Sequence, residues 1–301
     1  MLSINIPVYN VEVNSLVRQV MQQAQLAGID YEVRIYDDCS EEEIKKQNRN
    51  LAGYPGVVYK ELPQNLGRAV IRNKMGLDSD KSYLLFIDAD SRLDSETYIE
   101  MYVSRAFPGC VLCGGTKYDK AKPDNSKKLL RWVYGRKREA IPAGKRNSQK
   151  GFIITSNNFL IDREVFQHIH FRETIGPYGH EDTLLGYDLF SKNINPRHID
   201  NPIVHIGLED SDTFLAKTRK ALDNLLFISE DILENANDFN GCISFLNRYF
   251  KLTKLVPRIV LSFLFSLCKG VLERNLTGKR PLLLFYDLYK VGYFSTLKRS
   301  K

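Results

Sequence analysis

The sequence has few cysteines, and their arrangement excludes a disulfide framework. Only 5 of the 301 residues are Cys, an odd number, and Cys110 and Cys113 are the only close pair. Small disulfide-stapled domains carry even sets of cysteines. A structural zinc site would need a second pair or nearby histidines, which are absent here. We therefore interpret the cysteines as reduced thiols, with Cys110 and Cys113 buried on an apolar strand.

Neither a charged leader nor a membrane-spanning apolar run is found. Residues 252–276 are apolar but contain Lys254, Arg258 and Lys269, and the uninterrupted core from Ile259 to Cys268 is shorter than the roughly 20 residues that span a bilayer. The first ten residues pass directly into a strand-like segment. We therefore expect a cytoplasmic protein without a secretory signal or a transmembrane helix.

One apolar stretch ends abruptly in two carboxylates. The run from Tyr83 to Ile87 has no polar alternation, which is typical of a strand buried on both faces of a parallel sheet, and Asp88 and Asp90 follow it. Two carboxylates so placed favour a hard cation between them, Mg²⁺ or Mn²⁺ carried in by a diphosphate. The alternative is an ordinary strand end followed by an Asp/Ser turn.

Strand-like and helix-like segments alternate over the first ninety residues. The expected strands are 3–9, 31–36, 57–61 and 83–87, and the expected helices are 13–27, 41–51 with Ser40 as N-cap, and one opening at 64–73. This alternation predicts the α/β class: a Rossmann-like, mainly parallel sheet flanked by helices.

Three polar clusters follow these strands: Pro7-Val-Tyr-Asn10, Asp37-Asp38 and Asp88-Ala-Asp90. Parallel strands bring their carboxyl ends to one edge, so the clusters predict a shared nucleotide pocket. Asp38 would accept from a base N–H, Tyr9 would line or stack on the base, and Asp88 would reach ribose or phosphate. Arg68 and Arg72, one helical turn apart, would approach a diphosphate. The alternatives are a core aromatic, turn-forming carboxylates and a solvated arginine face.

Five motifs in this order resemble the family 2 inverting glycosyltransferases of the GT-A fold, bacterial type, over roughly residues 1–215. They are Ile6-Pro-Val-Tyr-Asn10, Asp37-Asp-Cys-Ser40, Asn65-Leu-Gly-Arg68 with Arg72-Asn73, Asp88-Ala-Asp90 and His180-Glu-Asp182. Two positions depart from the family pattern: Cys39 stands where Gly or Asn is common, and Arg68 where a small residue is common.

The resemblance implies roles for further residues. Asp182 would be the base that deprotonates the acceptor hydroxyl, Glu181 would hold sugar hydroxyls, and Pro7 would belong to the nucleotide site. His205 would join Asp90 as a metal ligand. The alternatives are an acidic pair at a helix N-terminus and a structural histidine.

The second half supplies candidates for the acceptor side. Gly114-Gly115 would allow a sugar to approach the backbone, and the strand expected at 152–161 would line the acceptor cleft. Residues 117–150 hold twelve basic and three acidic residues together with the single tryptophan, Trp132. This segment would form either a flap over the substrates or a solvated insertion.

The C-terminal region is helical in pattern and basic. Residues 248–301 carry twelve basic and two acidic residues, whereas acidic residues predominate outside this segment and 117–150. We expect residues 1–240 to form the nucleotide-sugar-binding and catalytic domain, and 241–301 a helical region. That region would pack on the domain or rest on anionic lipid, and its aromatic and basic tail favours membrane contact.

The residues and the resemblance together predict a metal-dependent, inverting hexosyl- or N-acetylhexosaminyltransferase. The donor would be a nucleotide-diphosphate sugar, preferably a UDP-sugar, and the acceptor a growing, lipid-linked surface glycan. The reaction would belong to polysaccharide biosynthesis at the inner face of the cell membrane.

A non-catalytic nucleotide- or glycan-binding module is the alternative. A sugar nucleotidyltransferase would need a glycine-rich basic loop after the first strand, which Pro7 to Glu12 lacks. Nucleic-acid binding is not expected, because no reading motif accompanies the basic segments.

Overall fold

The computed structural model describes residues 1–148, 154–175, 179–232 and 236–297, and these residues form two compact units. The first unit comprises Met1–Asp119, Ala140–Pro177 and Glu181–Gly207, and the second comprises Lys120–Glu139, Tyr178–His180 and Leu208–Lys301. The expected boundary at residue 240 between a catalytic domain and a helical region stays a prediction.

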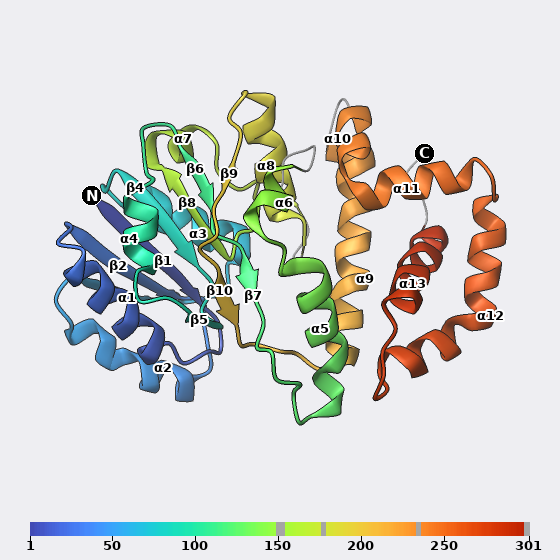
Figure 1. The fold of residues 1–301 in the computed structure, drawn as a ribbon, viewed down its shortest axis with the longest axis horizontal. Coiled ribbons are helices and arrows are strands. Elements are labelled where there is room, and N and C mark those ends of the chain that lie inside the picture. The colour runs from blue at the N-terminus through green and yellow to red at the C-terminus, as the bar shows by residue number, and fades with distance from the viewer. Residues whose placement is uncertain (149–153, 176–178, 233–235, 298–301) are drawn as a thin grey trace. The chain divides into compact units, whose positions relative to one another are not determined.

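A seven-stranded sheet forms the centre of the first unit (Figure 1). Its order is β3-β2-β1-β4-β8-β6-β9, and only β8 runs antiparallel to its neighbours. The strands are β1 (Leu2–Val8), β2 (Tyr31–Asp37), β3 (Val57–Glu61), β4 (Tyr83–Ile87), β6 (Val111–Cys113), β8 (Asn158–Asp162) and β9 (Arg197–His198). The prediction of a mainly parallel α/β sheet is thus confirmed.

A second, small sheet has the order β5-β10-β7. Its strands are β5 (Ser91–Leu93), β10 (Ile203–His205) and β7 (Thr116–Lys117). The chain from Val111 to Lys117 therefore contributes two short strands, β6 and β7, to different sheets. Of the strand expected at 152–161, residues 152 and 153 lie outside the described part of the chain, and the described strand begins at Asn158.

Helices pack on both faces of the large sheet. One layer contains α1 (Asn14–Leu26) and α4 (Tyr98–Val103), and the other contains α3 (Arg68–Leu77), α7 (Arg163–His168) and α8 (Glu181–Ser191). The remaining helices of this unit are α2 (Glu42–Asn48), with a 3-10 turn at Arg49–Gly53, and α6 (Ala143–Asn147).

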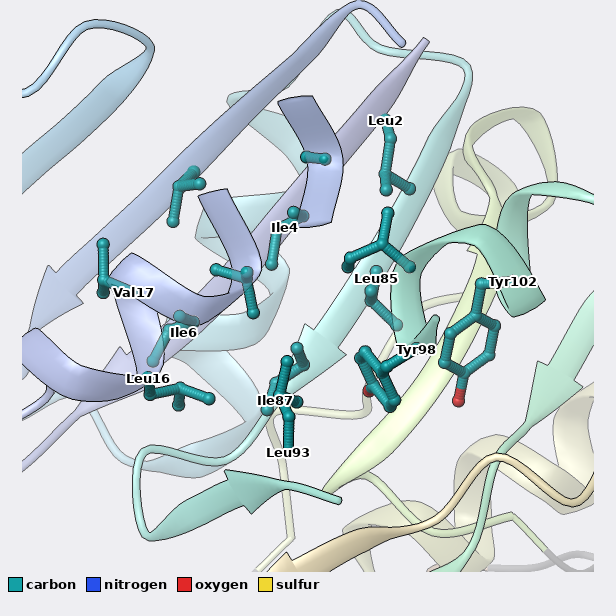
Figure 2. Packing of buried hydrophobic residues seen from close by; sticks show 14 of the residues in the cluster. Leu2, Ile4, Ile6, Leu16, Val17, Leu85, Ile87, Leu93, Tyr98 and Tyr102 are labelled. Atoms are coloured by element: carbon teal, nitrogen blue, oxygen red, sulfur yellow. The ribbon is translucent and has the colours of Figure 1, made fainter. Parts of the chain in front are cut away.

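Alternation along β4 divides its side chains between two cores. Leu85 and Ile87 belong to the cluster beneath α1 and α4, whereas Leu84 and Phe86 belong to the cluster beneath α3, α7 and α8. Figure 2 shows the first cluster, in which side chains of β1 face those of α1. The prediction that this strand is buried on both faces of the sheet is therefore confirmed.

The second unit is helical. It contains α5 (Leu129–Tyr134), α9 (Ser211–Phe227), α10 (Ala236–Cys242), α11 (Ser244–Thr253), α12 (Arg258–Leu276) and α13 (Leu283–Thr296). Its core comprises Leu130, Phe214, Leu215, Phe265, Leu272, Leu276, Tyr286 and Tyr289. Within the described residues no single helix has both the length and the apolarity to cross a membrane, although α11 and α12, bent by 107° at their break, together have them.

Candidate active site

The loops after β1 and β2 are joined at one edge of the sheet. Val8 pairs with Asp37, and beyond this pair the Asn10 N–H donates to Ser40 Oγ at 2.8 Å while Asn10 Oδ1 accepts from the Glu41 N–H at 2.7 Å. Ser40 therefore holds the neighbouring loop instead of capping α2, whose N-cap residue is Glu41. β4 pairs with the other side of β1, so the three polar clusters converge as predicted.

The Asp38 carboxylate organises the start of α3. It is buried, and its two oxygens accept from the N–H groups of Leu66 at 2.7 Å and Gly67 at 3.0 Å. Burial raises the pKa of Asp38, and these two hydrogen bonds partly offset that rise.

Tyr9 is 55 % exposed, so the alternative of a core aromatic is wrong. Pro7 is partly exposed at the end of β1.

Cys39 adopts a left-handed backbone conformation. Its φ is 64°, in a region that favours Gly and, to a lesser degree, Asn. The departure from the family pattern at this position therefore coincides with local backbone strain.

Arg72 is buried against Asp88. Its Nη2 lies 2.5 Å from Asp88 Oδ1, its Nη1 donates to the Arg68 carbonyl at 3.0 Å, and its guanidinium lies 5.9 Å from the Phe171 ring centroid. The alternative of a solvated helix face is wrong for Arg72, which is only 2 % exposed. Arg68 is exposed, and its Nη1 lies 3.8 Å from Glu181 Oε1. The guanidinium of Arg72 therefore gives the Asp88 carboxylate a positively charged partner within the protein.

Asp90 lies beside His205. The antiparallel pairing of β5 with β10 brings Ser91 opposite His205, and the Asp90 carbonyl accepts from the Ile206 N–H at 2.9 Å. As a result, His205 Nδ1 is 3.4 Å from Asp90 Oδ1. The His205 ring also makes an edge contact with Tyr118, with ring centroids 5.5 Å apart.

Gly207 gives the Asp90 side chain its space. A Cβ atom at this position would clash with the carboxylate, lying 2.8 Å from its Cγ and 2.7 Å from Asp90 Cβ. Such distances are below any ordinary carbon–carbon contact. The only trace of this role in the sequence is a glycine two positions after His205.

The carboxylate of Asp90 and the imidazole of His205 form a mixed oxygen and nitrogen donor pair. Such a pair suits a borderline first-row ion such as Mn²⁺ better than Mg²⁺, which prefers oxygen ligands. Across the described ranges, no group of three or more His, Cys, Asp or Glu side chains lies together as a complete metal site. The two residues fit a metal whose other ligands come from a diphosphate and water.

Glu181 and Asp182 form the first turn of α8. Glu181 is buried, and Asp182 Oδ1 accepts from the Thr183 N–H at 2.7 Å. Burial and then the neighbouring Glu181 carboxylate raise the pKa of Asp182 to about 7, while Thr183 and the charge of Arg72 act in the opposite direction. A carboxylate with this pKa can accept a proton near neutral pH. Residues 176–178 of the preceding glycine-rich turn lie outside the described part of the chain.

The pair Gly114-Gly115 accommodates protein groups. A Cβ on Gly114 would lie 2.5 Å from Nδ2 of Asn158, and one on Gly115 would lie 2.6 Å from Nη2 of Arg146. Asn158 is fully buried and its Oδ1 accepts from the Tyr102 hydroxyl at 2.7 Å. Both glycines also line a pocket together with Thr116 and Pro142, so the expectation of a sugar near them stays a prediction, as does the acceptor cleft expected along residues 152–161.

The buried Arg146 shows that the basic segment 117–150 is not one uniform flap. Its guanidinium donates to the carbonyls of Cys113, Gly114 and Ile199 within 3.0 Å. Residues 140–148 accordingly belong to the first compact unit and 120–139 to the second. A flap role could therefore concern only part of the segment.

An open, mainly parallel sheet with acidic and arginine side chains at its carboxyl edge is the arrangement at which doubly wound α/β domains bind their ligands. The family described as Glycosyl transferase family 2 matches residues 3–170, more than half of the chain. The chain belongs to this family and is a glycosyltransferase, as the motifs predicted.

Solved structures share the fold. A mannosyltransferase from Pyrobaculum calidifontis, in complex with GDP-Man and Mn²⁺, is 12 % identical with a TM-score of 0.58, over 96 % of this chain and 85 % of that one. Residues 1–349 of TarS from S. aureus, in complex with UDP-GlcNAc, are 17 % identical with a TM-score of 0.50, over 98 % and 89 %. The fold is GT-A, as predicted. No curated protein matches this sequence.

Proposed function

We propose that this glycosyltransferase moves a hexose or N-acetylhexosamine from a nucleotide-diphosphate donor to an acceptor hydroxyl with inversion of configuration. The observation that carries the proposal is the position of the Glu181 and Asp182 carboxylates in the first turn of α8, in the same compact unit as the Arg72–Asp88 ion pair and the Asp90–His205 pair. The first feature suits a general base, and the others suit a charged donor.

The donor is a nucleotide sugar, with a UDP-sugar preferred. Pro7, Tyr9 and Asp38 line the base and ribose side, while Arg68, Arg72 and Asp88 serve the ribose and the diphosphate. The similar folds solved with GDP-Man and with UDP-GlcNAc support this donor class. The two oxygens of the Asp38 carboxylate already accept hydrogen bonds from two backbone N–H groups. Each oxygen has a second lone pair, and this lone pair would accept from the N–H of the base.

Mg²⁺ or Mn²⁺ is the proposed cofactor, held by Asp90 and His205. When bound, the ion offsets negative charge on the departing diphosphate. The mixed donor pair makes Mn²⁺ the better fit, and the Mn²⁺ in the Pyrobaculum calidifontis complex supports the same choice.

In the proposed reaction, Asp182 accepts the proton of the acceptor hydroxyl as that oxygen attacks the anomeric carbon. The new carbon–oxygen bond forms on one face of the sugar while the bond to the diphosphate breaks on the other. The nucleoside diphosphate leaves with the bonding electrons, and no covalent enzyme intermediate forms. Glu181, held near Arg68, orients sugar hydroxyls.

We place the reaction in surface polysaccharide biosynthesis, on a growing, lipid-linked glycan at the inner face of the cell membrane. The basic, aromatic C-terminal region supports this assignment, because a lipid-linked acceptor would bring the enzyme to an anionic surface.

The test is nucleotide release from a panel of nucleotide sugars with Mg²⁺, Mn²⁺ or a chelator, and a membrane lipid extract as acceptor source. Release from one donor should require metal and be lost in Asp90→Ala and in Asp182→Asn, while Asp80→Asn, at an exposed aspartate, keeps it. Nucleotide binding without turnover of any donor, unchanged by Asp182→Asn, would instead support the non-catalytic binding module.

A further inference from the structure

Helix α12 presents large apolar side chains to solvent along most of its length. The exposed residues, here called the α12 apolar face, are Ile259, Val260, Phe263, Leu264, Leu267 and Val271. Ile259, Phe263, Leu267 and Val271 recur every four residues and so share one side of the helix. Ile259 is 78 % exposed and Leu267 is 67 % exposed.

Packing on the opposite side fixes this orientation. Phe265, Leu272 and Leu276 are buried in the core of the helical unit. Phe265 packs so closely on α13 that a Cβ on Gly292 would lie 2.5 Å from its Cγ, and its ring centroid lies 5.3 Å from that of Tyr289. Because this contact holds the helix, α12 cannot rotate to bury the α12 apolar face without losing part of the core.

A continuous apolar face is unusual on a protein surface. Single exposed apolar residues are ordinary, whereas a contiguous patch marks an interaction site. No charged residue interrupts the sequence from Ile259 to Cys268. The α12 apolar face therefore calls for a partner that removes it from water.

The surrounding charge identifies the kind of partner. Between residues 248 and 286, Glu273 is the single acidic residue. Exposed basic residues lie on both sides of the apolar stretch. Lys251 and Lys254 precede the helix, Lys269 and Arg274 lie in its C-terminal half, and Lys279 and Arg280 follow it. An apolar surface with cations at both ends matches lipid tails bordered by anionic headgroups. A second copy would bring the same cations face to face, which opposes self-association.

We propose that α12 lies in the plane of an anionic bilayer with the α12 apolar face inserted at the headgroup boundary. Only one side of the helix can meet lipid, because the other packs on α13, beside which it runs in Figure 1. This attachment requires neither donor nor acceptor, so its test is independent of the proposed reaction.

The experiment is co-sedimentation of the full chain with vesicles of phosphatidylcholine alone or mixed with phosphatidylglycerol. Wild type should sediment with the mixed vesicles, and the double variant Phe263→Glu/Leu267→Glu should bind about tenfold or more weakly. The matched control is Leu26→Glu, which changes a leucine on α1 that is even more exposed, at 78 %, and should bind as wild type does. Phe263→Trp, which stays apolar and suits the interface, should retain binding.

The charge contribution is tested separately with Lys254→Gln, Lys269→Gln and Lys279→Gln. Each should weaken binding to the mixed vesicles by about fivefold. Thermal unfolding of every variant confirms that it is folded. Equal sedimentation of wild type and the folded double variant overturns the proposal. A wild-type dimer that the double variant splits, with no vesicle binding by either, also overturns it in favour of a second copy as partner.

Discussion

His205 Nδ1 lies 3.4 Å from Oδ1 of Asp90, across two strands that are far apart in the sequence. The arrangement depends on the backbone of Gly207, which leaves no room for a side chain beside the carboxylate. The proposed metal site is therefore shaped as much by a missing Cβ atom as by its ligands.

Gly207→Ala should weaken activation by Mn²⁺, because the added methyl group displaces either Asp90 or the backbone that carries His205. Loss of such positioning typically costs about 10- to 100-fold in metal affinity. The measurement is nucleotide release against Mn²⁺ concentration. Gly53→Ala, at an exposed glycine with open space, is the control and should not change the titration. An unaltered Mn²⁺ dependence in Gly207→Ala would argue against a metal at Asp90.

Asp182→Asn should lower kcat by about 10²- to 10⁴-fold while leaving nucleotide affinity near wild type, because the amide cannot accept the proton. In the wild type the base is active only when ionised, so kcat should rise with pH and level off above the pKa of about 7. Steady-state rates across the pH range check both points. A residual rate in the variant with the same pH dependence would assign the titration to another group.

The same substitution should stabilise the protein at alkaline pH. Asp182 has a pKa of about 7 in the folded state, above the value of about 3.9 in an unfolded chain, so the folded state holds the proton more tightly. The stability contributed by that bound proton is complete at acidic pH and is lost as pH rises through about 7. We expect the free energy of unfolding of Asp182→Asn to exceed that of wild type near pH 8 and the difference to vanish below about pH 4. Urea unfolding at several pH values measures it, and a pH-independent difference contradicts it.

Arg72→Gln should move the pH midpoint of kcat upward. The charge of Arg72 lowers the pKa of Asp182, so its removal leaves burial and Glu181 less opposed. The variant also leaves Asp88 without its guanidinium partner, and donor binding should weaken. Arg49→Gln, at an exposed arginine paired with Glu42 and Glu61, is the matched control. A midpoint that stays in place would place Arg72 outside the electrostatic environment of the base.

Cys39→Gly should be more stable than Cys39→Ala by up to about 1 kcal/mol, because only glycine adopts a φ of 64° without steric cost. Both variants lack the thiol, so their difference isolates the backbone effect. Urea unfolding provides the comparison. Equal stabilities would mean that the loop relaxes around residue 39.

The sequence alone determined the class of fold and the edge at which the polar clusters meet. The unbroken apolar run at Tyr83–Ile87 required burial on both faces. Strand–helix alternation then made the strands parallel, which brought Asp38 and Asp88 to the same edge of the sheet. These features follow from local periodicity, which a linear pattern contains.

Tertiary structure decided which side chains pair. It directed Arg72 to Asp88 and Arg68 toward Glu181, although the two arginines lie one turn apart on the same helix. It packed Asn158 and Arg146 against Gly114 and Gly115, a contact that the spacing of these residues does not show. It also left the outer side of α12 exposed, because only one side reaches the core. These outcomes depend on three-dimensional packing and on which buried charges find partners, and neither is encoded in the spacing of residues along the chain.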